Sequence, residues 1–351
     1  MSDVIVAPNM RDLDDLARTL AGWMAERMPE ASAVRLDNLA YPRGAGQSHE
    51  TILFDANWFE RGESRTQGCV VRIKPQGFTV FPDNLFDEQY RLMKLLSDKG
   101  YVTVAKPLWF EPDPAVLGAP FFVMEKKLGR VPVSIPSYGK EGWVVEATPA
   151  QRRHMWESGL RQLAAVQHVP LAEVDFLAGP EHARDGLEQE WDKYCRFVAW
   201  VQEDRPWPVL ESALARLRDR WPGNQPAGLV WGDARLGNMM FDEQFNVIAV
   251  MDWEQPSLGG ALHDLAWWLT LSDLHHGASA DRPHMEGMGT RQETLALWEQ
   301  LTGKSSDDVE WYEEFTHLKM TCCGIRMAAL RGTEPPDSQA IARRLKVEVP
   351  A

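Results

Sequence analysis

The pattern of apolar and polar positions changes twice along the chain. Between residues 8 and 28, apolar side chains recur near the 3.6-residue period of a helix, which predicts an amphipathic helix. Short segments rich in β-branched and aromatic residues follow, a composition typical of strands. These segments are residues 34–40, 50–58, 68–74 and 120–126. They predict an antiparallel sheet in the first third of the chain.

One helix is predicted within this sheet region, at residues 83–99. Asp83 is expected to cap its start, because aspartate accepts the free N–H groups of a first turn, and Gly100 is expected to end it. Beyond about residue 128 the spacing becomes helical. Further helices are predicted at 149–167, 186–203, 208–220, 260–273, 290–302 and 308–331. Residues 228–253 interrupt them with short strand-like runs.

The change from strands to helices occurs at a short polar stretch, residues 125–130, which predicts a hinge rather than a long linker. We therefore expect an α+β fold with two lobes. The first, residues 1–126, contains the N-terminal helix and a small antiparallel sheet. The second, residues 127–351, is larger and mainly helical, and contains the segment with candidate chemistry described below.

Composition excludes several classes of function. The chain has 51 acidic and 37 basic residues and a net charge of −14, which argues against nucleic-acid binding and is compatible with a cationic substrate. No apolar run approaches the roughly 20 residues that span a bilayer, and the N-terminus lacks the features of a signal peptide. The four cysteines match no zinc-ligand spacing. We expect a cytoplasmic protein with no membrane partner and leave its oligomeric state open.

The segment 231–254 has the groups that phosphoryl transfer requires. Asp233, Arg235 and Asn238 lie in one loop, and Asp252 ends the apolar run that follows. Transfer of a γ-phosphoryl group needs a carboxylate to accept the proton of the attacking hydroxyl, oxygen ligands for Mg²⁺, and a cation. Asp233 suits the first role and Arg235 the last. Asn238 and Asp252 suit the role of oxygen ligands for Mg²⁺.

A lone aspartate in a loop is more often a turn or cap residue, so the spacing matters. Here Asn238 follows Asp233 by five positions, apolar runs flank the loop, and Asp252 ends an apolar run fourteen residues after Asn238. This compound pattern favours catalysis over a turn.

The same segment resembles the aminoglycoside phosphotransferase-like, or phosphotransferase enzyme, family, whose fold is similar to that of protein kinases. The family pattern is His-Gly-Asp-x-x-x-x-Asn, then an apolar strand ending in Asp-Trp, then Gly and Asp-Leu-Ala. The matching residues here are Gly232-Asp233, Asn238, Asp252-Trp253, Gly259 and Asp264-Leu265-Ala266. The residue sequence of this segment is similar to that of the kinase-like domain fused to some acyl-CoA dehydrogenases. It also resembles a mycobacterial branch assigned to aminoglycoside phosphotransferases. The resemblance implies a two-lobed kinase that uses ATP and Mg²⁺.

Two positions of the motif have expected structural roles. Trp231 stands where the family has histidine, a residue that mainly supports the loop, so local packing is expected to differ. Residues 231–238 are called the catalytic loop below. Asp264 is expected to brace this loop or to cap the helix that begins after Asp264.

The resemblance also places nucleotide-binding residues in the first lobe. Gly44, Gly46 and Ser48 precede a strand, where the family has its nucleotide-covering loop. Arg72 matches the basic residue that pairs with the α- and β-phosphates, and Lys74 is the alternative.

The same resemblance implies further positions of the nucleotide site. Gln89 falls where the family has the glutamate that positions this basic residue, with the neighbouring Glu88 and Asp87 as alternatives. The strand ending at residues 124–126 resembles the one that enters the hinge, where backbone groups bind the adenine edge. Met124 would border adenine, and Glu125 and Lys126 would lie near the hinge bonds.

The acceptor is left open by the sequence. It is a small-molecule hydroxyl, of an aminoglycoside, which would make antibiotic resistance the biological role, or of a hydroxyacyl-CoA or other hydrophobic alcohol. A catalytically silent nucleotide-binding protein is the alternative of another class, allowed by Gln89 and Trp231. His275, His276 and His284 are spaced too irregularly for a metal site, and we expect them to be solvated in a loop.

Overall fold

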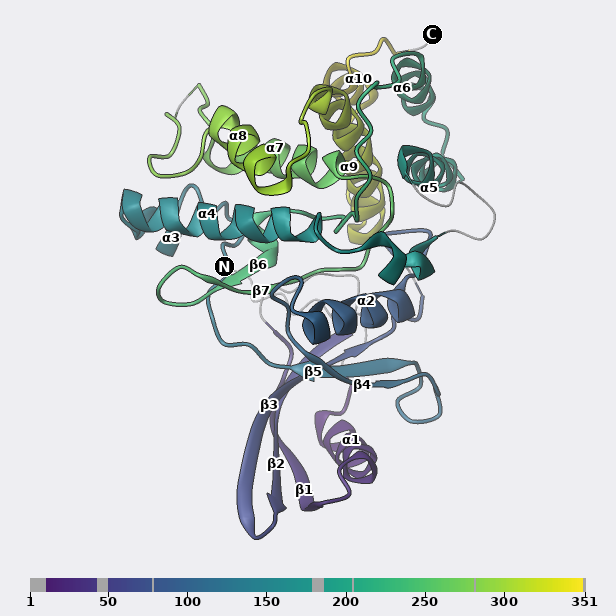
Figure 1. Cartoon of the computed structure of the whole chain (residues 1–351). Helices are drawn as coiled ribbons and strands as arrows, with labels where there is room; N and C mark the ends of the chain where they lie inside the picture. The colour runs from purple at the N-terminus through teal and green to yellow at the C-terminus, as the bar shows by residue number, and fades with distance from the viewer. Residues whose placement is uncertain are drawn as a thin grey trace. The chain divides into compact units, whose positions relative to one another are not determined.

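The computed structural model describes residues 11–42, 50–77, 79–178, 186–203, 205–280 and 282–349. The chain divides into two compact units, whose elements are labelled in Figure 1. The first unit consists of Met1–Thr79, Met93–Asp98 and Ala105–Leu128, and the second of Val80–Leu92, Lys99–Val104 and Gly129–Ala351.

The first unit contains a five-stranded antiparallel sheet in the order β1-β2-β3-β5-β4. Its strands are β1 (Ala31–Ala40), β2 (Glu50–Glu60), β3 (Glu63–Ile73), β4 (Pro107–Glu111) and β5 (Phe121–Glu125). The sheet confirms the predicted antiparallel architecture. The sequence prediction missed β4, whose five residues are too short to show a period and begin at a proline.

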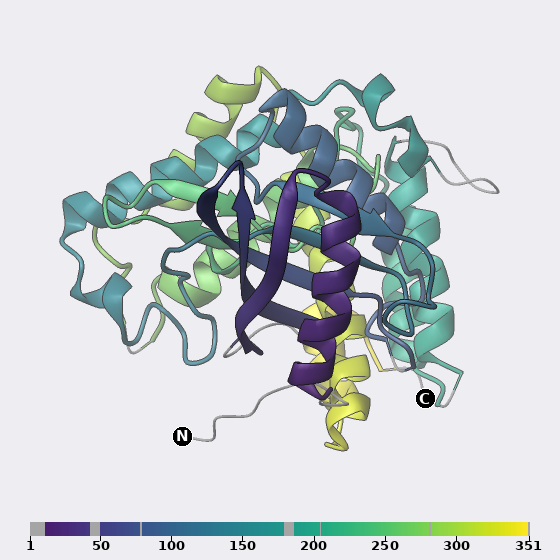
Figure 2. The same cartoon turned by 90° about the horizontal axis from the view of Figure 1, so that it is seen from below.

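Helix α1 (Leu13–Arg27) lies beside β1, as Figure 2 shows in purple. Its buried side chains join the core formed by the inner face of the sheet. Asp12 caps its start by accepting from the N–H groups of Asp14 and Asp15 at 2.9 and 3.1 Å. At its other end, Glu111 of β4 accepts from Trp23 Nε1 and from Arg27, each at 2.6 Å. The helix is therefore fastened to an edge strand as well as packed on the sheet.

Helix α2 (Phe86–Lys99) begins later than predicted. Asn84 Oδ1 accepts from the Phe86 N–H at 3.2 Å, whereas Asp83 forms an ion pair with Arg196 at 3.1 Å. The prediction that Asp83 caps this helix was therefore wrong, because a cation distant in sequence binds its carboxylate. Gly100 follows the helix with φ of 67°, the left-handed conformation predicted for its end.

The second unit is mainly helical. Its α-helices are α3 (Trp143–Glu146), α4 (Pro149–Val166), α5 (Gly186–Val201), α6 (Pro208–Asp219), α7 (Leu262–His276), α8 (Arg291–Thr302), α9 (Val309–Arg331) and α10 (Ser338–Leu345). Short 3₁₀ turns are η1 (Leu171–Glu173), η2 (Asp175–Leu177) and η3 (Leu236–Asn238), and β6 (Met239–Phe241) pairs antiparallel with β7 (Val247–Val250). Every helix predicted beyond residue 128 is present. The prediction missed α3 and α10, which are one and about two turns long.

A buried ion pair joins the helices of this unit. Lys319 of α9 lies 2.6 Å from Glu190 of α5, and both side chains are at most 4% exposed. Ser257 Oγ donates to the other oxygen of Glu190 at 2.6 Å, and His263 Nδ1 of α7 lies 3.2 Å from Lys319 Nζ. Burial opposes the charge on Glu190, but Lys319 and Lys193 outweigh it and lower the pKa of this carboxyl. The cluster therefore fixes α5, α7 and α9 to one another.

Within the described part of the chain, no helix is both long and apolar enough to cross a membrane.

Replacing one member of the buried pair tests its contribution to stability. Lys319→Met leaves Glu190 buried without its direct ion-pair partner, so we expect the free energy of unfolding to fall by about 3–5 kcal/mol. Urea denaturation measures this change. The control is Glu188→Gln on α5, the helix of Glu190. There an exposed pair between Glu188 and Arg218 should contribute at most about 1 kcal/mol. Equal effects of the two changes would contradict the role given to the buried pair.

Candidate active site

A buried carboxylate anchors the loop that precedes η3. Asp264, in the first turn of α7, accepts from the N–H of Trp231 at 2.6 Å and from the N–H of Gly232 at 2.9 Å. Gly232 has φ of 105°, and a Cβ at this position would lie 2.5 Å from the carbonyl oxygen of Gln255. Glycine is therefore required here both by conformation and by space. The bracing role expected for Asp264 is confirmed by these two hydrogen bonds.

Asp264 is only 1% exposed. Burial raises its pKa to about 6, although the two backbone N–H groups favour the ionised form. Its position therefore costs free energy that the bound loop must offset.

The carboxylate of Asp233 accepts from three side chains. Arg235 Nε lies 3.1 and 3.0 Å from its two oxygens, Asn238 Nδ2 lies 2.6 Å from Oδ2, and Trp267 Nε1 lies 2.6 Å from Oδ1. The Asp233 side chain remains 28% exposed. The carboxylate is thus held in one orientation but still accessible, which is the arrangement that a catalytic base or orienting group requires.

Arg235 connects this loop to a second segment. Its Nη1 donates to Ser134 Oγ at 2.6 Å, while its Nε remains on Asp233. Burial opposes its charge, but Asp233 and, more weakly, Asp252 outweigh burial and raise the pKa of the guanidinium. Arg235 therefore stays cationic beside the carboxylates.

Asn238 and Asp252 lie at the junction of the loop and the β6–β7 hairpin. The Met251 N–H donates to the Asn238 carbonyl at 2.8 Å, which brings the residue before Asp252 against the catalytic loop. Asn238 Nδ2 donates to Asp233, so its Oδ1 remains available as an acceptor. Asp252 has φ of 64°, a conformation that non-glycine residues rarely adopt and that is concentrated at functional sites. The structure thus brings together the four residues that the sequence indicated.

Trp231 supports the loop from a buried position. It is fully buried, and its Nε1 donates to the carbonyls of Met251 at 2.8 Å and Asp252 at 3.2 Å. Its ring lies 5.6 Å from that of Trp253, which is also fully buried. The larger side chain therefore holds the backbone at Asp252 directly.

The nucleotide residues expected in the first unit are only partly described. Gly44, Gly46 and Ser48 lie outside the described residues. Arg72 lies on β3, paired with Thr51 of β2 and Phe122 of β5. Its role stays a prediction.

Backbone groups near the expected hinge are already bonded within the first unit. The N–H of Glu125 donates to the Lys106 carbonyl and that of Lys126 to the Gly68 carbonyl, each at 2.9 Å. Lys126 Nζ also pairs with Asp55. Met124 lies on β5, in register with Val70 and Pro107. Any adenine contact by residues 125 and 126 must therefore use groups other than these two N–H groups.

Gln89 belongs to the second unit and is fully buried. Neither its side-chain oxygen nor its nitrogen has a hydrogen-bond partner among the described residues. A buried amide without partners costs free energy, so this position calls for an explanation. Its assignment to the nucleotide site stays a prediction.

Sequence reasoning missed two residues that contact the catalytic loop, Trp267 and Ser134. Trp267 follows Asp264 by three positions, so the two share one face of α7. That spacing was a signal within the Asp-Leu-Ala-Trp run. Ser134 lies about a hundred positions before Arg235, and no local pattern marks it.

The expectation for two of the three histidines was wrong. His275 and His276 end α7 and are 6% and 1% exposed, so they are not solvated. His275 Nδ1 lies 2.8 Å from Ser137 Oγ, and His276 Nδ1 lies 3.1 Å from the Tyr138 hydroxyl. Burial lowers their pKa values to about 4 and about 3.

Among the residues with described positions, no group of three or more His, Cys, Asp or Glu side chains is placed to hold a metal ion.

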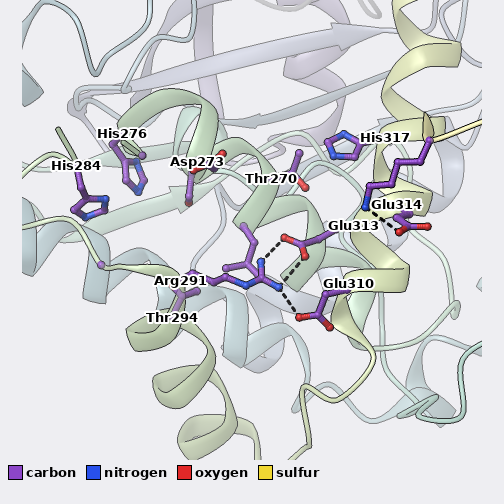
Figure 3. Close-up of a pocket in the computed structure, with 15 residues that line it drawn as sticks. Thr270, Asp273, His276, His284, Arg291, Thr294, Glu310, Glu313, Glu314 and His317 are labelled. Carbon is purple, nitrogen blue, oxygen red and sulfur yellow. Dashed lines mark hydrogen bonds and ion pairs between the residues drawn. The ribbon is translucent and has the colours of Figure 1, made fainter. Parts of the chain in front are cut away.

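A cavity of about 440 Å³ in the second unit is separate from this site. It is lined by residues of α7, α8 and α9, and Figure 3 shows its charged side chains. Arg291 donates to Glu313 at 2.5 and 2.8 Å and to Glu310 at 3.1 Å. Lys346 pairs with Glu314 at 3.0 Å. Cations of the chain itself engage these three glutamates, and none of the catalytic-loop residues lines the cavity.

Comparison with known proteins gives a family and a set of relatives. The model of the phosphotransferase enzyme family matches residues 53–301. Human acyl-CoA dehydrogenase family member 11 is 26% identical over 310 residues, which make up 84% of this chain and 36% of that protein. The chain spans about a third of the length of the curated relatives it matches.

Solved structures show the same fold. A candidate aminoglycoside phosphotransferase from Ralstonia eutropha JMP134 aligns with a TM-score of 0.66 and 22% identity over 94% of each chain. Amicoumacin kinase, solved with AMP-PNP, Ca²⁺ and Ami, aligns with a TM-score of 0.55 and 13% identity, over 96% of this chain and 95% of that one. These likenesses confirm the predicted kinase-like α+β fold.

The raised pKa of Asp264 predicts a pH dependence of stability. The folded state holds this proton more tightly than the unfolded state, so ionisation between about pH 4 and about pH 6 lowers the free energy of unfolding. Asp264→Asn removes this contribution, and urea denaturation at several pH values measures it. We expect the wild type to lose stability relative to the variant as pH rises through this range. Asp273→Asn, at an exposed position of the same helix, serves as the control. A wild-type-to-variant difference that stays constant with pH would contradict the assignment.

Proposed function

The chain belongs to the phosphotransferase enzyme family, and from this premise we propose that it transfers the γ-phosphate of ATP to a hydroxyl group of a small molecule in the presence of Mg²⁺. The observation that supports this most is the carboxylate of Asp233, which is oriented by three donors and remains accessible. Asn238 and Asp252 are proposed as its metal ligands.

Asp233 would accept the proton of the attacking hydroxyl or orient that hydroxyl. The three donors engage its two oxygens, and the side chain is still 28% exposed, so a substrate hydroxyl can reach it. Holding the acceptor hydroxyl in line with the phosphorus is the main contribution that a protein makes to this reaction.

The residues present fit a magnesium ion. Asn238 Oδ1 and the Asp252 carboxylate would supply oxygen ligands, and Mg²⁺ sites of this kind use one or two protein carboxylates together with substrate phosphates and water. A larger cluster of protein ligands is therefore not required. When bound, ATP supplies the phosphoryl group and Mg²⁺ offsets the charge of its phosphates.

Arg235 is proposed as a phosphate contact. Its Nε and Nη1 bind Asp233 and Ser134, while its Nη2 has no hydrogen bond to any residue in the described part of the chain. This third nitrogen remains available for a phosphate oxygen. The nucleotide itself is proposed to contact the residues that the family pattern indicates, which are Gly44, Gly46, Ser48, Arg72, Gln89, Met124, Glu125 and Lys126.

Two classes of acceptor are proposed for testing. An aminoglycoside is supported by the fold shared with the Ralstonia protein, which is named for that activity. A hydrophobic alcohol such as a hydroxyacyl-CoA is supported by the relatives, which are acyl-CoA dehydrogenase family members. A structural observation also favours the second class: Val133 and Ile135, on either side of the Ser134 that binds Arg235, are 54% and 85% exposed. A polycationic acceptor would gain little from such apolar neighbours.

Loss of either central carboxylate should abolish transfer. Asp233→Ala removes the group that orients the hydroxyl, and Asp252→Ala removes a metal ligand, so each should lower kcat by about 10³-fold or more. Transfer of labelled phosphate from ATP is measured against aminoglycosides, hydroxyacyl-CoAs and sterol-like alcohols. Glu243→Ala, at an exposed position of the β6–β7 hairpin, is the matched control.

Near wild-type turnover in both aspartate variants would overturn the assignment of the site. Calorimetry separates the proposal from a silent nucleotide-binding protein, because that alternative predicts Mg²⁺-dependent ATP binding without transfer to any acceptor.

A further inference from the structure

We propose that Trp267 is a positioning residue of the phosphoryl-transfer site, holding the Asp233 carboxylate through its indole N–H. The inference rests on the proposed function, since it assigns Asp233 to the reaction. The contact is short, 2.6 Å from Trp267 Nε1 to Asp233 Oδ1, and reaches across 34 positions of the sequence.

Helix α7 determines where this donor lies. Asp264 and Trp267 are separated by three positions, so their side chains emerge on one face of the first two turns. Asp264 holds the backbone N–H groups of Trp231 and Gly232. Trp267 holds the side chain of the next residue, Asp233. One face of one helix thus contacts three consecutive residues of the catalytic loop.

The indole suits this role for chemical reasons. It donates one hydrogen bond, accepts none and does not titrate, so it orients the carboxylate at every pH without adding a charge. Arg235 also binds the carboxylate, but it is bonded to Ser134 as well and therefore depends on a second segment. Trp267 has a single N–H in its side chain, and this group donates to Asp233.

The orientation of the Asp233 carboxylate should depend on this hydrogen bond. Without the Trp267 N–H, Oδ1 keeps only the Arg235 donor, which depends on a second segment. A carboxylate that is held less firmly aligns the acceptor hydroxyl with the phosphorus less often, so kcat falls while ATP still binds. Loss of ring packing alone would not confine the effect to kcat.

The test compares two adjacent tryptophans. Trp267→Phe keeps most of the ring and removes the N–H that binds Asp233. Trp268→Phe removes a buried N–H that has no hydrogen-bond partner among the described residues. We expect Trp267→Phe to lower kcat about tenfold or more, with a small change in KM for ATP. Trp268→Phe should leave both values close to those of the wild type.

A conservative variant and a spectroscopic measurement cover the case in which Trp267→Phe folds poorly. Trp267→His retains a five-membered ring with nitrogen at the matching position, so it should restore part of kcat above pH 7. In the wild type, the indole ¹H signal of Trp267 should lie downfield, as that of a hydrogen-bonded N–H does, and it should move upfield in Asp233→Ala, which removes the acceptor.

Defined outcomes would overturn the inference. They are equal kcat losses in Trp267→Phe and Trp268→Phe, or an indole signal of Trp267 that does not change in Asp233→Ala. The proposed function fails separately, when wild-type protein transfers phosphate to no acceptor of the panel. The indole measurement does not depend on turnover and still decides the role of Trp267 in that case.

Discussion

The hydrogen bonds from the backbone of Trp231 and Gly232 to the carboxylate of Asp264 are the constraint on which the candidate site depends. They set the path of the chain just before Asp233, and they tie it to the start of α7. Because the carboxylate is buried, its loss could not be replaced by water. The other contacts of the catalytic loop, from Asn238, Arg235 and Trp267, orient a side chain whose backbone is already placed.

A second set of contacts joins this loop to the hairpin that presents Asp252. Trp231 stands at the histidine position of the family pattern, and its indole N–H donates to the carbonyls of Met251 and Asp252. The Met251 N–H returns a hydrogen bond to Asn238. Since both proposed metal ligands are held by the same small network, the substitution changes the support of the site without removing it.

A buried cluster of charged groups joins α5, α7 and α9. Separating these charges would cost free energy. Glu190 of α5 and Lys319 of α9 are buried together, and His263 of α7 lies beside Lys319. His263 directly precedes Asp264, so the position of the loop anchor depends on this cluster. A buried pair of this kind adds little net stability over apolar packing, but it permits few alternative arrangements of the helices.

The sequence by itself determined the architecture and indicated four residues of the candidate site. Helical and strand periods are local, so an antiparallel sheet followed by helices could be predicted, and the spacing from Asp233 to Asn238 and Asp252 indicated their chemistry. Short elements such as β4 and α3 were missed, because five or fewer residues show no period. Asp83, His275 and Trp267 show what only the tertiary structure decided. Each has a partner that is distant in sequence, Arg196, Ser137 and Asp233 respectively, and no local pattern specifies which distant groups the packing of helices brings within hydrogen-bonding distance.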